Sequence, residues 1–286
     1  MRIKRRALNR SYGGDAVLVV FLLLFGLVMV LPLVYAVSSA LKPPDEFWIF
    51  PPRFFAQNPN LRNFKSLFNL MSASWVPFSR YVINTVFISV VGTVGHIVIA
   101  SLCAYVLAKH EFPGSKIIFQ VIVLALMFNT TVTAVPNFLI FSRLGWIDSY
   151  WVLIVPAFAS PLGLYLMKQF MEQMVPNSLL EAARIDGARE GLIFWRIVIP
   201  IVKPAWLTLG IFSFFSLWGI GGTNLVQSEE LKTLNYALAQ IVTSTGFARA
   251  GVSAAASVLM MIVPIIVFIF SQSNIVETMS TSGMKE

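Results

Sequence analysis

The sequence predicts an all-α membrane protein with six transmembrane helices. Of its 286 residues, 57% are hydrophobic and only 12% are charged, whereas a soluble domain has about 25% charged residues. In addition, six stretches contain no Asp, Glu, Lys or Arg, and each can cross about 30 Å of hydrocarbon as a helix. These stretches are residues 16–41, 81–108, 117–142, 150–167, 204–228 and 250–276.

Helices are expected in these stretches because barrel strands would be about half as long and would alternate between polar and apolar residues. The first stretch follows four basic residues within positions 2–6, so a cleaved secretory signal is an alternative interpretation. The apolar core of such a signal has about 7–15 residues. Residues 16–41 form a longer run, which favours a retained first helix.

Lys and Arg are concentrated in the segments that this topology places inside. With both termini inside (N-in/C-in), residues 1–15, 109–116, 168–203 and 273–286 hold 13 of the 21 basic residues. An excess of basic residues on the inner side is typical of membrane proteins. The same distribution explains the net charge of +8, because no basic stretch interleaved with aromatic residues indicates a nucleic-acid groove.

Two of the outer loops are expected to contain short helices. Residues 42–80 combine Pro pairs with many aromatic residues, which predicts an ordered cap with an interfacial helix near Asn60 to Leu70. In the last outer loop, residues 223–249, apolar residues recur at helical spacing between positions 231 and 242 and predict a second such helix.

The inner loop, residues 168–203, holds an unusual concentration of charge for this chain and is expected to be ordered. Ser178 and Glu181 have the spacing of a capping box, in which each side chain accepts a hydrogen bond from the other's free backbone N–H. This spacing predicts a helix that begins at Leu179.

Gly187 is expected to end this helix, because glycine suits the left-handed position after a helix end. A second helix of about twelve residues then runs to Ile199, before Pro200. Small residues between the two helices would let another protein approach the backbone closely, which predicts a docking surface, although capping alone would also explain Glu181. The small residues are Ala182, Ala183, Gly187 and Ala188.

The spacing of these residues resembles the "EAA" loop of permease subunits from binding-protein-dependent ABC importers. The matching residues are Glu181-Ala182-Ala183, Asp186-Gly187-Ala188, Ile199-Pro200 and Pro204. The loop also falls between the fourth and fifth of six stretches, where such importers place it. The segments "SSALKPPDEFW" and "VETMSTSGMKE", with Asn84-Thr85, resemble the maltose-type, carbohydrate-importing branch, and the resemblance covers essentially the whole chain.

This resemblance implies a type I ABC importer permease fold, as one domain over residues 1–286, in a prokaryotic cell (inner) membrane. It implies that the loop is a coupling helix docked on an ATP-binding subunit. ATP and Mg²⁺ would be bound by two such partners, since this chain has no GxxxxGK[ST] loop. The other implied partners are a second, related permease subunit, an extracytoplasmic binding protein and a carbohydrate. The implied docking residues are Glu181, Ala182, Ala183, Asp186, Gly187 and Ala188.

An ion- or proton-coupled secondary transporter is the alternative function. Such a transporter normally needs ionisable side chains within its membrane helices, and only His96 is of the usual relay kind here. A membrane enzyme would need a nucleophile with a base, or a metal cluster. Because His96 and His110 fall on different elements and Cys103 is the single cysteine, no catalytic or metal-binding set is predicted.

Polar and aromatic side chains within the apolar stretches are candidates for a sugar pathway. Ser, Thr and Asn in membrane helices also commonly bond across helix interfaces, so a packing role is open for each. The basic residues of the outer loops would suit an acidic sugar. The pathway candidates are Asn84, Asn129, Thr131, Asn137, Tyr165 and Trp218.

Overall fold

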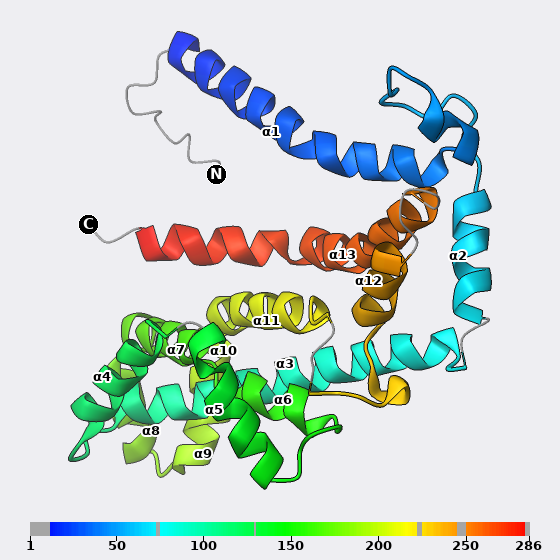
Figure 1. Ribbon diagram of the computed structural model, residues 1–286. Coiled ribbons are helices and arrows are strands. Elements are labelled where there is room, and N and C mark those ends of the chain that lie inside the picture. The colour runs from blue at the N-terminus through cyan, green and yellow to red at the C-terminus, as the bar shows by residue number, and fades with distance from the viewer. Residues whose placement is uncertain (1–11, 73–74, 129, 222–224, 245–249, 284–286) are drawn as a thin grey trace. The chain divides into compact units, whose positions relative to one another are not determined.

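The protein is built from helices. The computed structural model describes residues 12–72, 75–128, 130–221, 225–244 and 250–283, and these residues contain helices but no strand (Figure 1). The longest helices are α1 (Tyr12–Leu41), α3 (Phe78–Lys109) and α13 (Ala250–Gly283). The chain divides into two compact units, residues 1–70 with 241–259 and residues 71–240 with 260–286.

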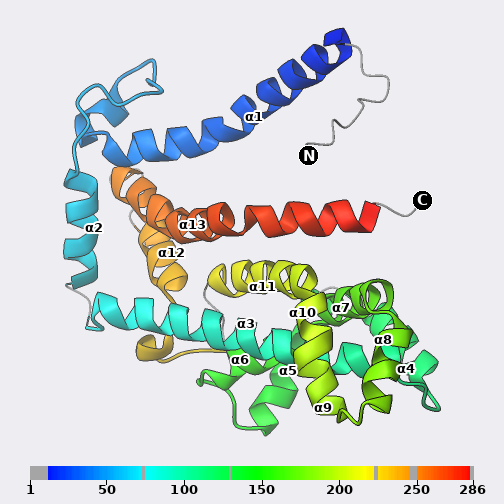
Figure 2. The ribbon, with the colours of Figure 1, turned by 180° about the vertical axis from the view of Figure 1, so that it is seen from behind.

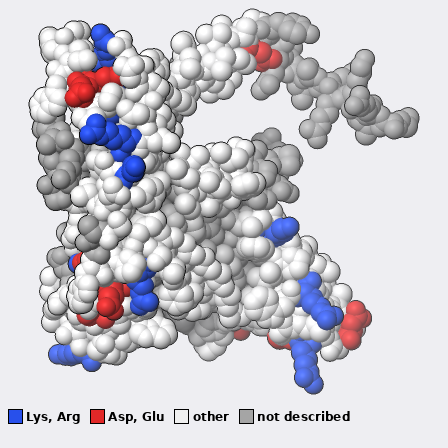
Figure 3. All heavy atoms as spheres, turned by 90° about the vertical axis from the view of Figure 1, so that its right-hand side faces the viewer, with Lys and Arg blue, Asp and Glu red and all other residues white. Residues whose placement is uncertain are grey.

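Four helical segments in the described residues are long and apolar enough to cross a membrane, which confirms an all-helical, multi-pass protein. The number rises to five if a pair of helices that meet at 80° is one span. Charged side chains gather in a few places on the face in Figure 3, and wide uncharged areas separate them. The four segments are Gly13–Leu41, Phe78–Lys109, Trp151–Met174 and Ala250–Gln272, and the bent pair is Glu190–Ile201 with Lys203–Trp218.

The third predicted span, residues 117–142, is not one continuous helix. It is divided into α4 (Ser115–Ala125) and α5 (Thr130–Arg143). At the end of α4 the Leu126 N–H donates to the Val123 carbonyl (3.2 Å), a tightened last turn, and the Asn and Thr residues that follow favour caps over helix interiors. With 11 and 14 residues, the two helices reach about 16 and 21 Å, short of the hydrocarbon thickness.

In the first unit, the segment after α1 is the ordered cap that the sequence predicts. It begins with the short 3-10 helix η1 (Pro44–Trp48) and leads to α2 (Arg62–Ser72), which confirms the predicted helix near this position. The buried carboxylate of Glu46 accepts hydrogen bonds from the backbone N–H groups of Gln57 (3.0 Å) and Asn58 (2.9 Å). These bonds fold the irregular segment back onto η1.

The second unit is organised around α3. This helix packs against α6 (Trp151–Phe158), α7 (Pro161–Met174) and α11 (Lys203–Trp218), and Figures 1 and 2 show them side by side from opposite directions. The approach of α7 to α3 is close, because a Cβ atom at Gly163 would lie 2.1 Å from Nε2 of His96. The close packing of α3 and α7 therefore requires glycine, which has no side chain, at position 163.

The segment predicted as the last outer loop contains η3 (Glu229–Leu231) and α12 (Leu234–Ser244), which confirms the helix predicted there. The first turn of α12 is capped from another element, because Oγ1 of Thr85 on α3 accepts a hydrogen bond from the Leu234 N–H (2.7 Å). Thr85, almost 150 positions earlier in the chain, thus accepts a hydrogen bond from a backbone N–H that has no acceptor within the helix.

Candidate functional site

Residues 168–174 of the predicted inner loop belong to α7, and α8 (Asn177–Ile185) is the next helix. The capping box is not formed, because the helix starts two residues earlier than predicted. Pro176 is the residue before the first turn (φ −67°, ψ 137°), and no side chain caps that turn. Proline holds φ near −65° and so sets the start of the helix. Ser178 and Glu181 consequently lie within α8 instead of bracketing its first turn.

Gly187 ends α8 as predicted, in the left-handed conformation (φ 80°). Two backbone bonds close the helix end: the Gly187 N–H donates to the Arg184 carbonyl (3.0 Å), and the Ala188 N–H donates to the Ala183 carbonyl (3.0 Å). This pair of bonds is the Schellman motif, which satisfies carbonyls left free at a helix end. The chain therefore turns into α9 (Glu190–Ile193) in a defined geometry.

One face of α8 is packed against the membrane helices. Leu180 and Ala183 are buried in a core to which α3 and α7 contribute. Ala188 is half-buried against the same core. The predicted exposed face of small residues is thus corrected: Ala183 lies on the packed face, since it shares the helical periodicity of Leu180, and Ala188 follows the turn inward.

The opposite face of α8 is open. Glu181, Ala182, Asp186 and Gly187 are exposed, in agreement with a surface available for contact. Ile185 lies on the same face and is 87% exposed. Sequence reasoning passed over this isoleucine, although its spacing of three and four residues from Ala182 and Glu181 places it on their face. An isolated exposed apolar residue of this size, between charges, suits a contact with another protein.

Glu190 ties the loop to α3, and its role was not predicted. Its carboxylate accepts hydrogen bonds from Nε of Arg184 (2.7 Å) on α8 and from the hydroxyl of Tyr105 (2.7 Å) on α3. Nε2 of His110 lies 3.5 Å away. The hydrogen bond from Arg184, followed by that from Tyr105, lowers the pKa of Glu190. The cluster thus holds a carboxylate in its charged form where α8, α9 and α3 meet.

A second set of hydrogen bonds joins the start of α8 to the same end of α3. Nζ of Lys109 donates to the Val175 carbonyl (2.6 Å) and to Oδ1 of Asn177 (3.0 Å). The side chain of Asn177 is therefore occupied by Lys109, which adds a reason why it does not cap α8. Hydrogen bonds therefore connect both ends of α8 to α3 and attach the loop to the helical core.

The second helix of the loop has about the predicted length, but it ends two residues later and is less regular than predicted. After α9 come a π-helical turn, η2 (Phe194–Val198), and α10 (Ile199–Ile201), so the helical path continues through Pro200. The N–H of Ile199 bonds to the carbonyl of Phe194, five residues back. Shifts to π-type bonds accompany helix irregularities, and proline cannot supply the usual bond. The indole of Trp206 then donates to the Ile199 carbonyl (3.2 Å).

Among the pathway candidates, Asn84 has a visible packing role. It is buried, and its Nδ2 donates to the carbonyls of Glu230 (2.8 Å) and Lys232 (2.9 Å). Its Oδ1 accepts a hydrogen bond from the Tyr150 hydroxyl (2.8 Å). These bonds hold the segment before α12 against α3, and a place in the sugar pathway stays a prediction.

Trp218 and Tyr165 are also in contact with other helices. Trp218 is buried, and its Nε1 donates to the Met260 carbonyl of α13 (3.3 Å). Tyr165 on α7 stacks on Phe119 of α4, with ring centroids 5.9 Å apart. Both rings therefore contribute to helix packing, and their contact with a solute stays a prediction.

The remaining candidates are less enclosed. Thr131 and Asn137 are exposed on α5, and Asn129 lies outside the described residues. The described candidates come from four helices: α3, α5, α7 and α11. As for metal sites, the part of the chain that the structure describes contains no group of three or more His, Cys, Asp or Glu side chains that could hold an ion.

An all-helical, multi-pass membrane protein with a structured helical loop between its spans is the class that this fold and site define. Residues 96–281 match a family described as "Binding-protein-dependent transport system inner membrane component". The chain therefore belongs to this family of inner-membrane transport components.

Two of the relatives are named as permeases. The chain is 30% identical over 215 residues to the polygalacturonan/rhamnogalacturonan transport system permease protein YtcP of Bacillus subtilis, covering 73% of this chain and 70% of that protein. It is 27% identical over 266 residues to the arabinooligosaccharides transport system permease protein AraQ of Halalkalibacterium halodurans, covering 90% and 92%.

Among solved structures, a chain of a bacterial ABC transporter involved in the import of the acidic polysaccharide alginate has the same fold. The TM-score is 0.77 at 23% sequence identity, and the match covers 93% of this chain and 99% of that chain. The helical arrangement described above is thus that of an ABC importer permease.

Proposed function

We propose that this chain is the permease subunit of an ATP-driven importer that translocates an oligosaccharide delivered by an extracytoplasmic binding protein. Membership of the binding-protein-dependent family supports this proposal. So do the two relatives, whose names refer to transport of sugar polymers and oligosaccharides. The sugar class rests on the names of these relatives.

The observation that carries the mechanism is the attachment of α8. This helix is bonded to α3 through Glu190 and Lys109 and is packed on α7 through Leu180. A packed core moves between discrete arrangements and does not deform continuously. A displacement of the exposed face of α8 would therefore move α3 and α7 with it.

In this mechanism an ATPase subunit docks on the exposed face of α8. Glu181, Ala182, Asp186 and Gly187 would form the contact, and Ile185 would fill an apolar hollow on the partner. Ala183 and Ala188 would instead hold the loop on the core, which revises the docking set implied by the family resemblance.

Energy would come from other chains. Two ATPase subunits would bind ATP and Mg²⁺, and a second, related permease subunit would complete the pathway, with N-in/C-in topology placing α8 on the ATPase side. ATP can drive the inward- to outward-facing change only by as much as it prefers one state over the other. This chain itself would bind no cofactor.

A proton-coupled secondary transporter is the competing hypothesis, and one observation favours it. His96 is buried on α3, and among the described residues no hydrogen-bond partner lies near its Nε2. A relay would need further ionisable groups in the spans. The membrane stretch that contains His96, residues 81–108, has no Asp, Glu, Lys or Arg.

Reconstitution of the complex tests the two hypotheses. The chain is co-purified with neighbouring gene products and placed in vesicles with ATP inside and the binding protein with oligosaccharide outside. We expect uptake that requires ATP hydrolysis and is insensitive to a protonophore. Uptake that follows an imposed proton gradient without ATP, or a native complex that lacks an ATPase subunit, would support the competing hypothesis instead.

A further inference from the structure

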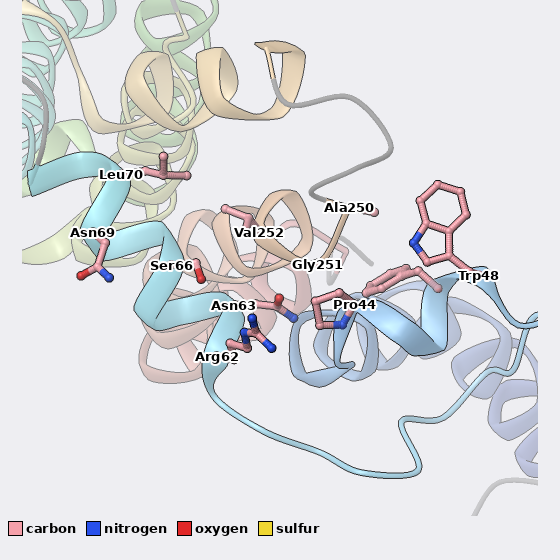
Figure 4. Close-up of a pocket in the computed structure, with 11 residues that line it drawn as sticks. Pro44, Trp48, Arg62, Asn63, Ser66, Asn69, Leu70, Ala250, Gly251 and Val252 are labelled. Atoms are coloured by element: carbon pink, nitrogen blue, oxygen red, sulfur yellow. The ribbon is translucent and has the colours of Figure 1, made fainter.

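A pocket of about 380 Å³ lies within the first unit, between η1, α2 and the first turn of α13 (Figure 4). Trp48 of η1 and a row of polar residues on α2 line it: Arg62, Ser66 and Asn69. The backbone of Gly251 forms part of the opposite wall. The pocket therefore combines an aromatic side chain, the positively charged guanidinium of Arg62 and neutral hydrogen-bonding groups.

The walls of this pocket are held by buried polar contacts. Asn63 is buried on α2, and its Nδ2 donates to the carbonyls of Ala40 (2.8 Å) and Lys42 (2.7 Å) at the end of α1. A Cβ atom at Gly251 would lie only 2.5 Å from the same nitrogen. The end of α1, α2 and the start of α13 thus meet around one amide, which makes the pocket largely preformed, as ligand sites usually are.

The two most distinctive side chains of the pocket are not used by the fold. Trp48 is 72% exposed. In the described part of the chain, the guanidinium of Arg62 forms no ion pair and no side-chain hydrogen bond. The buried carboxylate of η1, Glu46, accepts hydrogen bonds from two backbone N–H groups. An exposed indole and an unpaired guanidinium therefore face the same cavity.

We propose that this pocket binds a carboxylated sugar unit of an acidic oligosaccharide, an inference that rests on the proposed importer function. A guanidinium forms two parallel hydrogen bonds with a carboxylate, and Arg62 would make this contact. The indole of Trp48 offers an apolar face to the sugar ring. Ser66 and Asn69 offer groups that can both donate to and accept from sugar hydroxyls.

Two observations favour an acidic over a neutral sugar. Among the described residues that line the pocket, the charged side chain is basic and none is acidic. In addition, the chain shares its fold with an importer subunit for alginate, an acidic polysaccharide, and is similar to a permease named for polygalacturonan. The pocket would act as a subsite at the start of the span Ala250–Gln272 that selects the charged substrate.

The test measures binding of two probes to the purified complex without binding protein. The probes are trigalacturonate and its fully methylated ester, which has the same rings without the negative charges. Hydrogen bonds to charged groups are worth about 1.5–3 kcal/mol, so we expect the acid to bind at least about tenfold more tightly than the ester.

Three variants separate the contributions. Arg62→Gln should reduce the preference for the acid to less than about twofold. Lys65→Gln removes the same charge from α2 outside the pocket and should keep most of the preference. Trp48→Ala should weaken acid and ester to a similar extent, because stacking on the ring does not depend on the carboxylate.

Three outcomes would overturn the inference: equal binding of the two probes by the parent complex, equal effects of Arg62→Gln and Lys65→Gln, or no binding of either probe. ATP-dependent uptake is measured with the same preparation. If uptake of a sugar occurs while the acid preference does not depend on Arg62, the subsite is wrong and the importer function stands. If no sugar is taken up under any condition, the proposed function itself fails.

Discussion

Glu190 shows how a single carboxylate can position a loop. Its carboxylate accepts hydrogen bonds from Arg184 of α8 and from Tyr105 of α3, and Tyr105 lies 85 residues earlier in the chain. Its side chain is 47% exposed, so solvent weakens the ion pair relative to a buried one. The geometry nevertheless joins α8, α9 and α3 through one carboxylate, which makes Glu190 a positioning residue for the proposed coupling.

Glu190→Gln should loosen the loop without unfolding the membrane helices. The ion pair with Arg184 is lost, and the amide nitrogen of Gln cannot accept one of the two hydrogen bonds that the carboxylate accepts, at a cost of about 1 kcal/mol after allowance for solvent. We expect backbone amides at 184–193 to exchange hydrogen several-fold faster, with reduced sugar-stimulated ATPase activity. Glu111→Gln removes an exposed carboxylate near the same end of α3 and is the control. Equal exchange in both variants would contradict the positioning role.

Asp148 predicts a pH dependence in another loop. The hydroxyl of Ser228 and the backbone N–H groups of Ser228 (2.7 Å) and Gln227 (2.9 Å) donate to its carboxylate, and the Ser228 hydroxyl is the main cause of its lowered pKa. A lowered pKa means that the charged form stabilises the fold above the unfolded-state value of about 4. This contribution is lost as the pH falls through the lower folded-state pKa.

Hydrogen exchange at residues 227–228, corrected for the intrinsic rate, should therefore be constant between pH 7 and 5 and increase below about pH 4. Asp148→Asn should raise the exchange at pH 7 and remove the acid-dependent increase. Asn tolerates the left-handed φ of 59° at this position, so the backbone need not change. An acid-dependent increase that persists in the variant would argue against this assignment.

At the scale of elements, α8 depends on the turn at Gly187. An L side chain in the left-handed region costs about 1–2 kcal/mol, so Gly187→Ala should destabilise the Schellman end and shift α9 relative to α8. Gly191→Ala is the matched control, because Gly191 lies in α9 with open space around it, and alanine there should be neutral or slightly stabilising. Thermal melting and coupled ATPase activity in the reconstituted complex would distinguish the two variants.

At the scale of the whole molecule, the exposed face of α8 is predicted to determine assembly. Ile185→Ala removes most of an 87% exposed side chain whose burial in an interface would contribute about 1.5–3 kcal/mol. We expect roughly tenfold weaker co-purification of the ATPase subunits and no change in melting of the chain itself. Ile117→Ala makes the same change at an exposed site on α4 and is the control. Similar losses in both variants would remove the docking role of α8.

Much of the element pattern follows from local sequence. Apolar length locates α1, α3 and α13, and the left-handed turn is predicted by Gly187 itself. The break within residues 117–142 was not predicted, because apolar composition alone does not reveal where a helix stops when Thr and Asn follow it. The capping box failed for a related reason: Pro176 and Lys109 act on the start of α8 from outside the motif.

By itself, the sequence determined that this protein is helical, lies in a membrane and carries a charged helical loop, because apolar runs and glycine turns act over a few neighbouring residues. Only the tertiary structure decided that Ala183 faces inward, that Glu190 joins three helices and that Arg62 faces a pocket with Trp48. These features depend on contacts between segments far apart in the chain, and no local periodicity encodes which distant side chain a residue will meet.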